Sequence, residues 1–403
     1  MASVEITIDK DKLQHLFGSS DGFRHIIEQA VNKMLKVEMS EHLRADPSER
    51  SDERMGYRNG HYSRSITTRV GTLHLEVPRD REGTFRTELF ERFQRSEQAL
   101  VLSMMDMVVQ GVSTRKVKHI TQILCGREFS KSTVSQLCKG LDEQVNAFLN
   151  RGLNDVAYPF VIADAMYCKV RHNGRVRSTA VLMAVGINEE GYREILGLEV
   201  SMKESTQSWG TFFARLRERG LSGIDFITTD QHLGLVAALR EHFPGATWQR
   251  CQAHFIRNVM DSVRPEAKEK VMALLKQVLY SESPETARRA QEHFREELEL
   301  IAPKAVAQLE EAFEDVTAVL SLPEKYRRRL RTSNMMERQI EEVRRRERVI
   351  RIFPNEASAR RLIGALLNER HEAWMSGRLY LNMQTYNDYK TKQDILDQAA
   401  AAA

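Results

Sequence analysis

The stretch Tyr158-Pro-Phe-Val-Ile-Ala-Asp-Ala-Met-Tyr-Cys-Lys-Val-Arg171 predicts a buried β-strand. Apolar residues alternate along it, and Val161, Ala163 and Ala165 keep the second face apolar as well. A strand that is apolar on both faces lies in the middle of a sheet. Asp164 interrupts it, and an unpaired carboxylate there is costly, so it must meet a cation, a hydrogen-bond cluster or a water-filled site. A structural Asp held by backbone N–H groups is the alternative.

The composition is that of a globular protein with room for several domains. The chain has 403 residues, 41% hydrophobic and 29% charged, with a net charge of +4. No apolar run is long enough to span a membrane, and the first residues lack a secretion signal. We therefore expect no membrane partner, and the four scattered cysteines indicate a cytoplasmic protein with reduced thiols.

The chain around Asp164 predicts an α/β domain. The expected elements are strands over 175–187, 192–200, 224–230 and 247–250 and helices over 206–219 and 235–243. Asp230 then lies at the carboxyl end of a strand, where open α/β sheets hold their ligands; a helix N-cap is the alternative. Cys251 and His254 form half a zinc site at most, so a structural role beside the fourth strand is favoured.

The last third of the chain changes character twice. Residues 256–325 show helical apolar stripes and no strand signal, which indicates a helical insertion. From Lys325 to Arg351 the chain then holds eleven Lys and Arg and four Glu. Glu337 lies on a helix here, although Asn334 three residues earlier fits a capping box. We expect Arg344, Arg345 and Arg346 to contact a polyanion; a solvated helical face is the alternative.

The first 90 residues predict a helical segment and a small hairpin. An apolar stripe over 23–37 packs either on another subunit or within the same chain. Residues 61–78 alternate as a hairpin does, with arginines along its edges, and a solvated charged edge is the simple interpretation of them. These arginines are Arg58, Arg64, Arg69, Arg79 and Arg81.

Residues 96–150 predict helices with a sharp break, in the layout of a helix-turn-helix. One helix covers 111–124, with Ser113 or Thr114 as its cap, and a second covers 131–141 after a short turn. The exposed start of the second helix suits phosphate and base contacts, although helix pairs of this kind also occur without DNA. The candidate DNA-binding residues are Lys131, Ser132, Thr133, Ser135 and Gln136.

Short motifs spread over most of the chain resemble bacterial insertion-sequence transposases of the Mutator type. The matching pieces include Gly56-Tyr-Arg-Asn-Gly60, Pro78-Arg79-Asp80-Arg81, Gly111-Val-Ser-Thr-Arg-Lys116, Ser132-Thr-Val-Ser135, Asp164-Ala-Met-Tyr167, Glu194-Ile-Leu-Gly197, Glu204-Ser205 with Trp209, Trp248-Gln-Arg-Cys-Gln-Ala-His254, Thr332-Ser-Asn-Met-Met-Glu337 and Arg344-Arg-Arg346. The resemblance implies a ribonuclease-H-like catalytic domain in which two Asp and one Glu bind divalent metal. These map onto Asp164, Asp230 and Glu337, although Gln231-His232 and Ser333-Asn334 depart from the family's usual neighbours.

The resemblance also implies a domain plan. We expect an N-terminal helical or dimerisation segment with a basic hairpin (1–90), a helix-turn-helix domain (91–150), a ribonuclease-H-like domain in two parts (151–256 and 326–385) around an all-helical insertion (257–325), and a tail (386–403).

The expected function is that of a DDE transposase. It would bind the terminal inverted repeats and target DNA as a homodimer near the nucleoid, and cleave and join strands with two Mg²⁺ or Mn²⁺ ions held by hard oxygen ligands. A catalytically inactive, transposase-derived DNA-binding regulator is the alternative, since a helix-turn-helix can act without chemistry. A ribonuclease acting on RNA–DNA hybrids is a third hypothesis, which the helix-turn-helix and the insertion disfavour.

Overall fold

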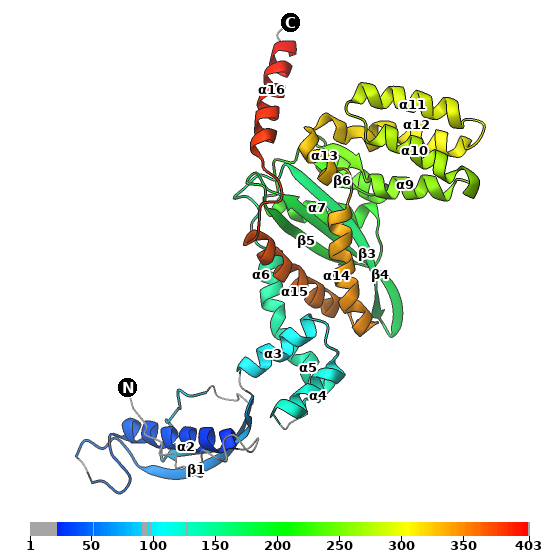
Figure 1. The fold of residues 1–403 in the computed structure, drawn as a ribbon. Helices are drawn as coiled ribbons and strands as arrows, with labels where there is room; N and C mark the ends of the chain where they lie inside the picture. The colour runs from blue at the N-terminus through cyan, green and yellow to red at the C-terminus, as the bar shows by residue number, and fades with distance from the viewer. Residues whose placement is uncertain (1–21, 51, 91–95, 97, 126–127, 402–403) are drawn as a thin grey trace. The chain divides into compact units, whose positions relative to one another are not determined.

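The computed structural model describes residues 22–50, 52–90, 96, 98–125 and 128–401, and Figure 1 traces the chain. It forms two compact units, Met1–Gly140 and Leu141–Ala403. The expected N-terminal helical segment is therefore visible only from residue 22 onward, and residues 1–21 lie outside the described part.

The first unit opens with a helix packed on a hairpin. Helix α2 (Gly22–Leu43) packs against β2 (Gly71–Asp80), which pairs antiparallel with β1 (Arg58–Thr68). Their common core contains Leu35, Met39, Leu43, Ile66, Leu73, Leu75 and Val77, with Ile27 and Val31 packed against it. Part of the predicted apolar stripe is thus covered by the chain's own hairpin, which is the second of the two alternatives above. Phe23, at the start of the stripe, stays 49% exposed.

The remainder of the first unit consists of short helices. These are α3 (Gln98–Val109), α4 (Thr114–Cys125), α5 (Lys131–Leu137) and the 3₁₀ turn η1 (Cys138–Gly140). The hydroxyl of Ser113 accepts the Lys116 N–H at 3.3 Å, and that of Ser130 caps α5. The second helix was expected to reach Leu141 but ends at Leu137, because the chain tightens into a 3₁₀ turn before Gly140, a poor helix former.

The second unit is built on a five-stranded sheet. In order along the sheet, β5 (Arg193–Ser201), β4 (Arg175–Ile187), β3 (Phe160–His172), β6 (Phe226–Thr229) and β7 (Thr247–Arg250) lie side by side. The pairs β3–β4 and β4–β5 are antiparallel, whereas β6 is parallel to β3 and β7 is parallel to β6. The predicted strand around Asp164 is therefore the central strand.

Helices cover both faces of this sheet, which explains why β3 is apolar on both sides. On one face Val161 and Ala163 pack with Trp209 of α7 (Thr206–Glu218) and Leu235 of α8 (Leu233–His242). The other face meets helices from the end of the chain: α13 (Glu324–Leu330), α14 (Asn334–Ile350) and α15 (Glu356–Met375). Asp164 alternates with Ala163 along β3, so its side chain belongs to the α14 face.

A group of four helices interrupts the sequence between the sheet and α13. They are α9 (Gln252–Asp261), α10 (Lys268–Leu279), α11 (Pro284–Leu298) and α12 (Pro303–Thr317), followed by the 3₁₀ turn η3 (Ala318–Ser321). They share a core that includes Phe255, Leu275 and Phe294. As predicted, residues 256–325 contain no strand.

The second unit also contains α6 (Leu141–Leu149) at its start and α16 (Gln384–Ala401) at its end. Arg361 of α15 forms a bidentate pair with Asp142 of α6, at 2.7 Å to each carboxylate oxygen. This pair connects the first helix of the unit to α15, one of the helices that cover the sheet. Helix α16 projects away from the rest of the unit in Figure 1. Within the described residues, no helix combines the length and apolar character needed to cross a membrane.

Candidate active site

Asp164 occupies a nearly buried position on the central strand. Its side chain is 9% exposed, and Oδ1 accepts the Ala165 N–H at 2.8 Å. Burial raises the pKa of Asp164 to about 6; the Ala165 N–H and the charge of His254 oppose the rise, and the carboxylates of Asp230 and Glu337 add to it. Asp164 is therefore a carboxylate with few internal donors and two acidic neighbours, and not the well-satisfied structural Asp of the alternative.

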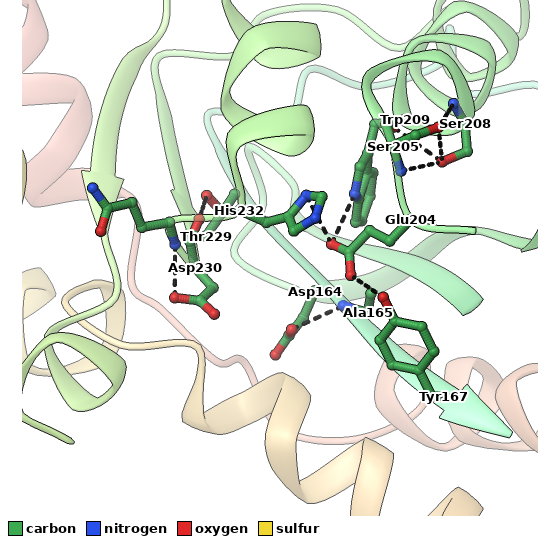
Figure 2. Close-up of polar contacts among 11 residues, drawn as sticks. Asp164, Ala165, Tyr167, Glu204, Ser205, Ser208, Trp209, Thr229, Asp230 and His232 are labelled. Atoms are coloured by element: carbon green, nitrogen blue, oxygen red, sulfur yellow. Dashed lines mark hydrogen bonds and ion pairs between the residues drawn. The ribbon is translucent and has the colours of Figure 1, made fainter. Parts of the chain in front are cut away.

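Asp230 is the first residue after β6. This strand, expected over 224–230, ends at Thr229. Strands β3 and β6 are parallel, with Ile162 paired to Thr228, so continuing this register brings Asp164 beside Asp230. Asp230 Oδ1 accepts the Gln231 N–H at 2.7 Å, as Figure 2 shows. It does not cap α8, whose N-cap is His232.

Glu337 comes from the first turns of α14, on the helix that covers the Asp164 face. The N-cap of α14 is Ser333, which makes no side-chain capping hydrogen bond, and Asn334 is already the first helical residue. The capping-box alternative for Glu337 is therefore wrong, because the helix starts one residue earlier than that motif requires. The Glu337 side chain is 34% exposed and points its carboxylate at His254.

His254 lies between two of the three carboxylates. Its Nε2 is 3.4 Å from Glu337 Oε1, and its Nδ1 is 4.0 Å from Asp230 Oδ1. Contact with the Cys251 thiol, assisted by the charges of Asp230 and Asp164 and opposed by burial, raises the pKa of His254 to about 9. An imidazolium at this position neutralises part of the acidic cluster.

Cys251 anchors the start of the His254 helix. It is the N-cap of α9 and fully buried, and its Sγ accepts hydrogen bonds from Ser333 N at 3.2 Å and from Ser333 Oγ at 3.3 Å. These bonds join α9 to the segment that leads into Glu337. The sequence predicted a structural role for Cys251 and His254, but it missed that His254 contacts the candidate acidic residues; its place three residues after Cys251, next to the end of β7, was the available signal.

A fourth acidic residue, Glu204, links the segments that carry both aspartates. Its carboxylate accepts hydrogen bonds from the Tyr167 hydroxyl at 3.0 Å and from Trp209 Nε1 at 3.1 Å, and lies 3.4 Å from His232 Nδ1 (Figure 2). Tyr167 is three residues after Asp164, and His232 is two residues after Asp230. Sequence reasoning noted Glu204 only as part of a family motif.

Gly234 allows α8 to pack closely against the loop that carries Glu204. Gly234, in the first turn of α8, packs so tightly that an added Cβ would lie 2.6 Å from Thr206 N and 2.7 Å from Ser205 C, both backbone atoms. Any larger residue would push α8 away from the loop that carries Glu204. His232, two residues earlier, would then lose its place beside the Glu204 carboxylate.

The donor set suits a hard divalent cation, although it is not arranged as a finished metal site. Aspartate and glutamate oxygens are the ligands that Mg²⁺ and Mn²⁺ favour, and a cation would stabilise the charged form of Asp164, whose pKa is raised by burial first and by its acidic neighbours second. Within the described part of the chain, no three His, Cys, Asp or Glu side chains stand close enough together to hold a metal ion. His254 lies between Asp230 and Glu337, where its imidazolium supplies positive charge beside both carboxylates.

The predicted DNA-contacting side chains of α5 lie on an exposed face. Ser132, Thr133, Ser135 and Gln136 are all exposed, while Val134 is buried. The hydroxyls of Ser132 and Thr133 lie 2.7 and 2.8 Å from the hydroxyl of Ser130, the cap residue. For Lys131 the structure describes the backbone alone. Their contact with DNA stays a prediction.

The three consecutive arginines of α14 differ from one another. Arg344 is exposed, and Arg345 is 63% exposed with Nη2 2.9 Å from Glu342 Oε1. Arg346 is only 6% exposed and forms an ion pair with the same glutamate. It follows the buried Val343 by three residues, so it lies on the helix face that packs against α15 and not on a surface open to a phosphate. The expectation that Arg346 grips DNA therefore needs correction.

Comparison with known proteins identifies the family. Residues 1–377 match the family described as "Transposase, Mutator family". The "Transposase for insertion sequence element ISRM5" of Rhizobium meliloti (strain 1021) is 44% identical over 375 residues, which span 93% of this chain and 94% of that protein. The "Transposase for insertion sequence element IS256 in transposon Tn4001" of Staphylococcus aureus is 41% identical over 389 residues, 95% of this chain and 99% of the relative.

A solved structure is far less similar. The "Drosophila P element transposase strand transfer complex" aligns with 80% of this chain and 88% of its own at 11% identity, and its TM-score of 0.29 is too low to establish a shared fold. The family match and the sequence relatives, which extend over almost the whole chain, decide the matter: this chain belongs to the Mutator family of transposases.

Proposed function

We propose that this transposase binds the ends of an insertion sequence, cleaves DNA strands by metal-assisted hydrolysis and joins the freed 3′-hydroxyl to a new phosphodiester. The observation that carries the proposal is the gathering of Asp164, Asp230 and Glu337 on one side of the central strand, around His254. These carboxylates come from a strand, a strand end and a helix far apart in the sequence.

The sheet supports a ribonuclease-H-like catalytic domain. Three antiparallel strands followed by two parallel ones place the first strand at the centre, with one Asp on it and the second Asp after its parallel neighbour. The helices α9–α12 then act as an insertion between β7 and the Glu337 helix. In this plan the insertion lies between the segment that carries Asp230 and the helix that carries Glu337.

Asp164, Asp230 and Glu337 would hold Mg²⁺ or Mn²⁺ as a pair of ions. Bound metal supplies a Lewis acid and lowers the pKa of a coordinated water. The chain itself orients the ligands: the Gln231 N–H fixes the Asp230 carboxylate, and Cys251 and Ser333 hold α9 against the start of α14. His254 would keep the Asp230 and Glu337 carboxylates in place by its charge until metal arrives.

DNA recognition is assigned to two surfaces. The exposed side chains of α5 would contact the terminal inverted repeats, with α4 as the supporting helix of a helix-turn-helix. Arg344 and Arg345 on α14 would contact the backbone of the DNA that enters the site, while Arg346 stays within the protein. Because two element ends must be joined, a homodimer is the working assembly.

A plasmid-nicking assay tests the proposal. Full-length protein with Mg²⁺ should nick a plasmid that carries the inverted repeats flanking its gene, and Asp164→Asn should not. Asp155→Asn, which removes an exposed carboxylate from the same unit, is the matched control and should nick like the parent. Mn²⁺ binding followed by electron paramagnetic resonance should weaken in Asp164→Asn alone. Parental nicking by Asp164→Asn would disprove the assignment, and binding of DNA without nicking by the parent would favour the regulator.

A further inference from the structure

The hairpin unit contains a basic, aromatic pocket that the catalytic site and the predicted helix-turn-helix leave unused. It has a volume of about 260 Å³ and lies between the end of the hairpin and the segment that follows β2. Its lining includes Tyr62, Arg64, Arg79, Phe85, Arg86 and Phe90. Two of these arginines, Arg64 and Arg79, belong to the basic edge of the hairpin, which the sequence alone would explain as a solvated charged edge.

Aromatic rings hold two of the pocket's arginines in fixed orientations. The Arg79 guanidinium lies 4.7 Å from the ring centroid of Tyr62, and that of Arg64 lies 4.5 Å from the ring centroid of Phe90. A guanidinium stacked on a ring keeps its N–H edge available for hydrogen bonding. Arginines held in this way are not the mobile side chains of a solvated edge.

The positive charge in the pocket is only partly compensated. Within the described residues, neither Arg79 nor Arg86 has a carboxylate at ion-pair distance, and Arg86 Nη1 donates to the Phe85 carbonyl at 3.0 Å. The acidic residue in the lining is Asp80, whose oxygens accept the Thr84 N–H, the Thr84 hydroxyl and the Phe85 N–H. Asp80 therefore shapes the loop, and Arg79 and Arg86 leave the lining with positive charge that this carboxylate does not pair.

We propose that this pocket is a second nucleic-acid contact, which binds the phosphodiester backbone of duplex DNA without reading its sequence. Planar guanidinium groups match phosphate oxygens in bidentate geometry, and backbone contacts position a protein on DNA without specifying bases. The same compact unit carries α5, so the pocket would hold DNA alongside the helix proposed to recognise it. The inference rests on the proposed function in that it takes DNA as the partner.

The test is a salt titration of binding by the full-length protein. The probe is a fluorescein-labelled duplex of random sequence, followed by anisotropy. The double variant Arg79→Ala/Arg86→Ala should flatten the slope of log affinity against log salt by about one to two units, since each neutralised phosphate contributes roughly 0.9. Lys36→Ala/Arg50→Ala removes the same charge from exposed positions outside the pocket and should keep the parental slope.

Two further measurements make the result decisive. Thermal unfolding of both double variants checks that the hairpin unit stays folded. If the alanine variant does not fold, Arg79→Lys/Arg86→Lys takes its place. The lysine variant keeps the charge but loses the planar fork, so it should bind DNA more weakly than the parent. Equal slopes for the pocket variant and its control would overturn the proposal. A parent that binds the duplex but does not nick the plasmid would contradict the proposed function and leave the pocket proposal standing.

Discussion

Asp80 in the hairpin unit and Asp164 in the sheet are both nearly buried, yet their surroundings shift their pKa values in opposite directions. Asp80 accepts hydrogen bonds from Thr84 and Phe85, with the Thr84 hydroxyl first among them, and these hold its pKa well below the ordinary value. Asp164 accepts a single backbone N–H, and burial raises its pKa to about 6. Local donors satisfy a structural carboxylate, whereas a carboxylate left short of donors is available to an external cation.

The largest effect should come from Asp164→Asn, which would separate function from folding. Cleavage should fall by about 10³-fold or more, as when a central catalytic group is removed, because the reacting metal would lose a ligand. Stability at neutral pH should hold or rise, since a buried charge disappears. Single-turnover cleavage and urea unfolding of the same preparation measure both. A variant that loses stability would place Asp164 with Asp80 as a structural residue.

Asp80→Asn should show the converse pattern. Losing charged acceptors for the Thr84 and Phe85 groups should cost about 2–3 kcal/mol of hairpin-unit stability. Hydrogen exchange at the β1 and β2 amides measures it, with Glu82→Gln at an exposed neighbouring position as the control. Cleavage per folded molecule should not change when DNA is saturating, because Asp80 lies outside the candidate catalytic site. Unaltered exchange would mean that the loop does not depend on this carboxylate.

Glu204→Gln should fall between these two cases. The amide can still accept from Tyr167 or Trp209, but His232 loses its charged partner, so the loop beside Asp230 becomes less well positioned. We expect a loss of about 1–2 kcal/mol in stability and about tenfold in cleavage. Glu199→Gln, which breaks an ion pair with the exposed Arg215, controls for loss of a glutamate charge. Parental cleavage by Glu204→Gln would show that the network serves folding alone.

A further effect concerns pH, and its sign should differ between the two aspartates. Asp80, with a depressed pKa, contributes stability that is present above about pH 4 and is lost as the pH falls below it. Asp164, with a folded pKa of about 6, binds its proton more tightly in the folded state, so metal-free protein should lose stability as the pH rises from about 4 to about 6. Denaturant midpoints against pH should lose the first slope in Asp80→Asn and the second in Asp164→Asn. Each variant should keep only the slope caused by the other aspartate. Remaining slopes of the same sign in the two variants would contradict the comparison.

The local elements around the site follow from sequence patterns. Alternation over 158–171 predicted a strand buried on both faces, turn residues predicted β4 at the observed position, and the short strand expected over 247–250 is β7. The acidic residues Asp164, Asp230 and Glu337 were identified by motif resemblance, and the register of β3 and β6 accounts for Asp164 lying beside Asp230; Glu337 comes from α14, which this register does not place. Side-chain periodicity is a property of neighbouring residues, so it can be read before the chain folds.

What only the tertiary structure decided is which side chains from distant segments meet. Arg344, Arg345 and Arg346 are chemically identical in the sequence, yet the third is buried because its face of α14 packs against α15. Arg79 looks like an ordinary edge residue until Tyr62 across the hairpin stacks on it. His254 was read as structural until α9 and α14 brought it to Glu337. Burial and pairing depend on how separate elements pack, and no local pattern encodes the partner on the other side.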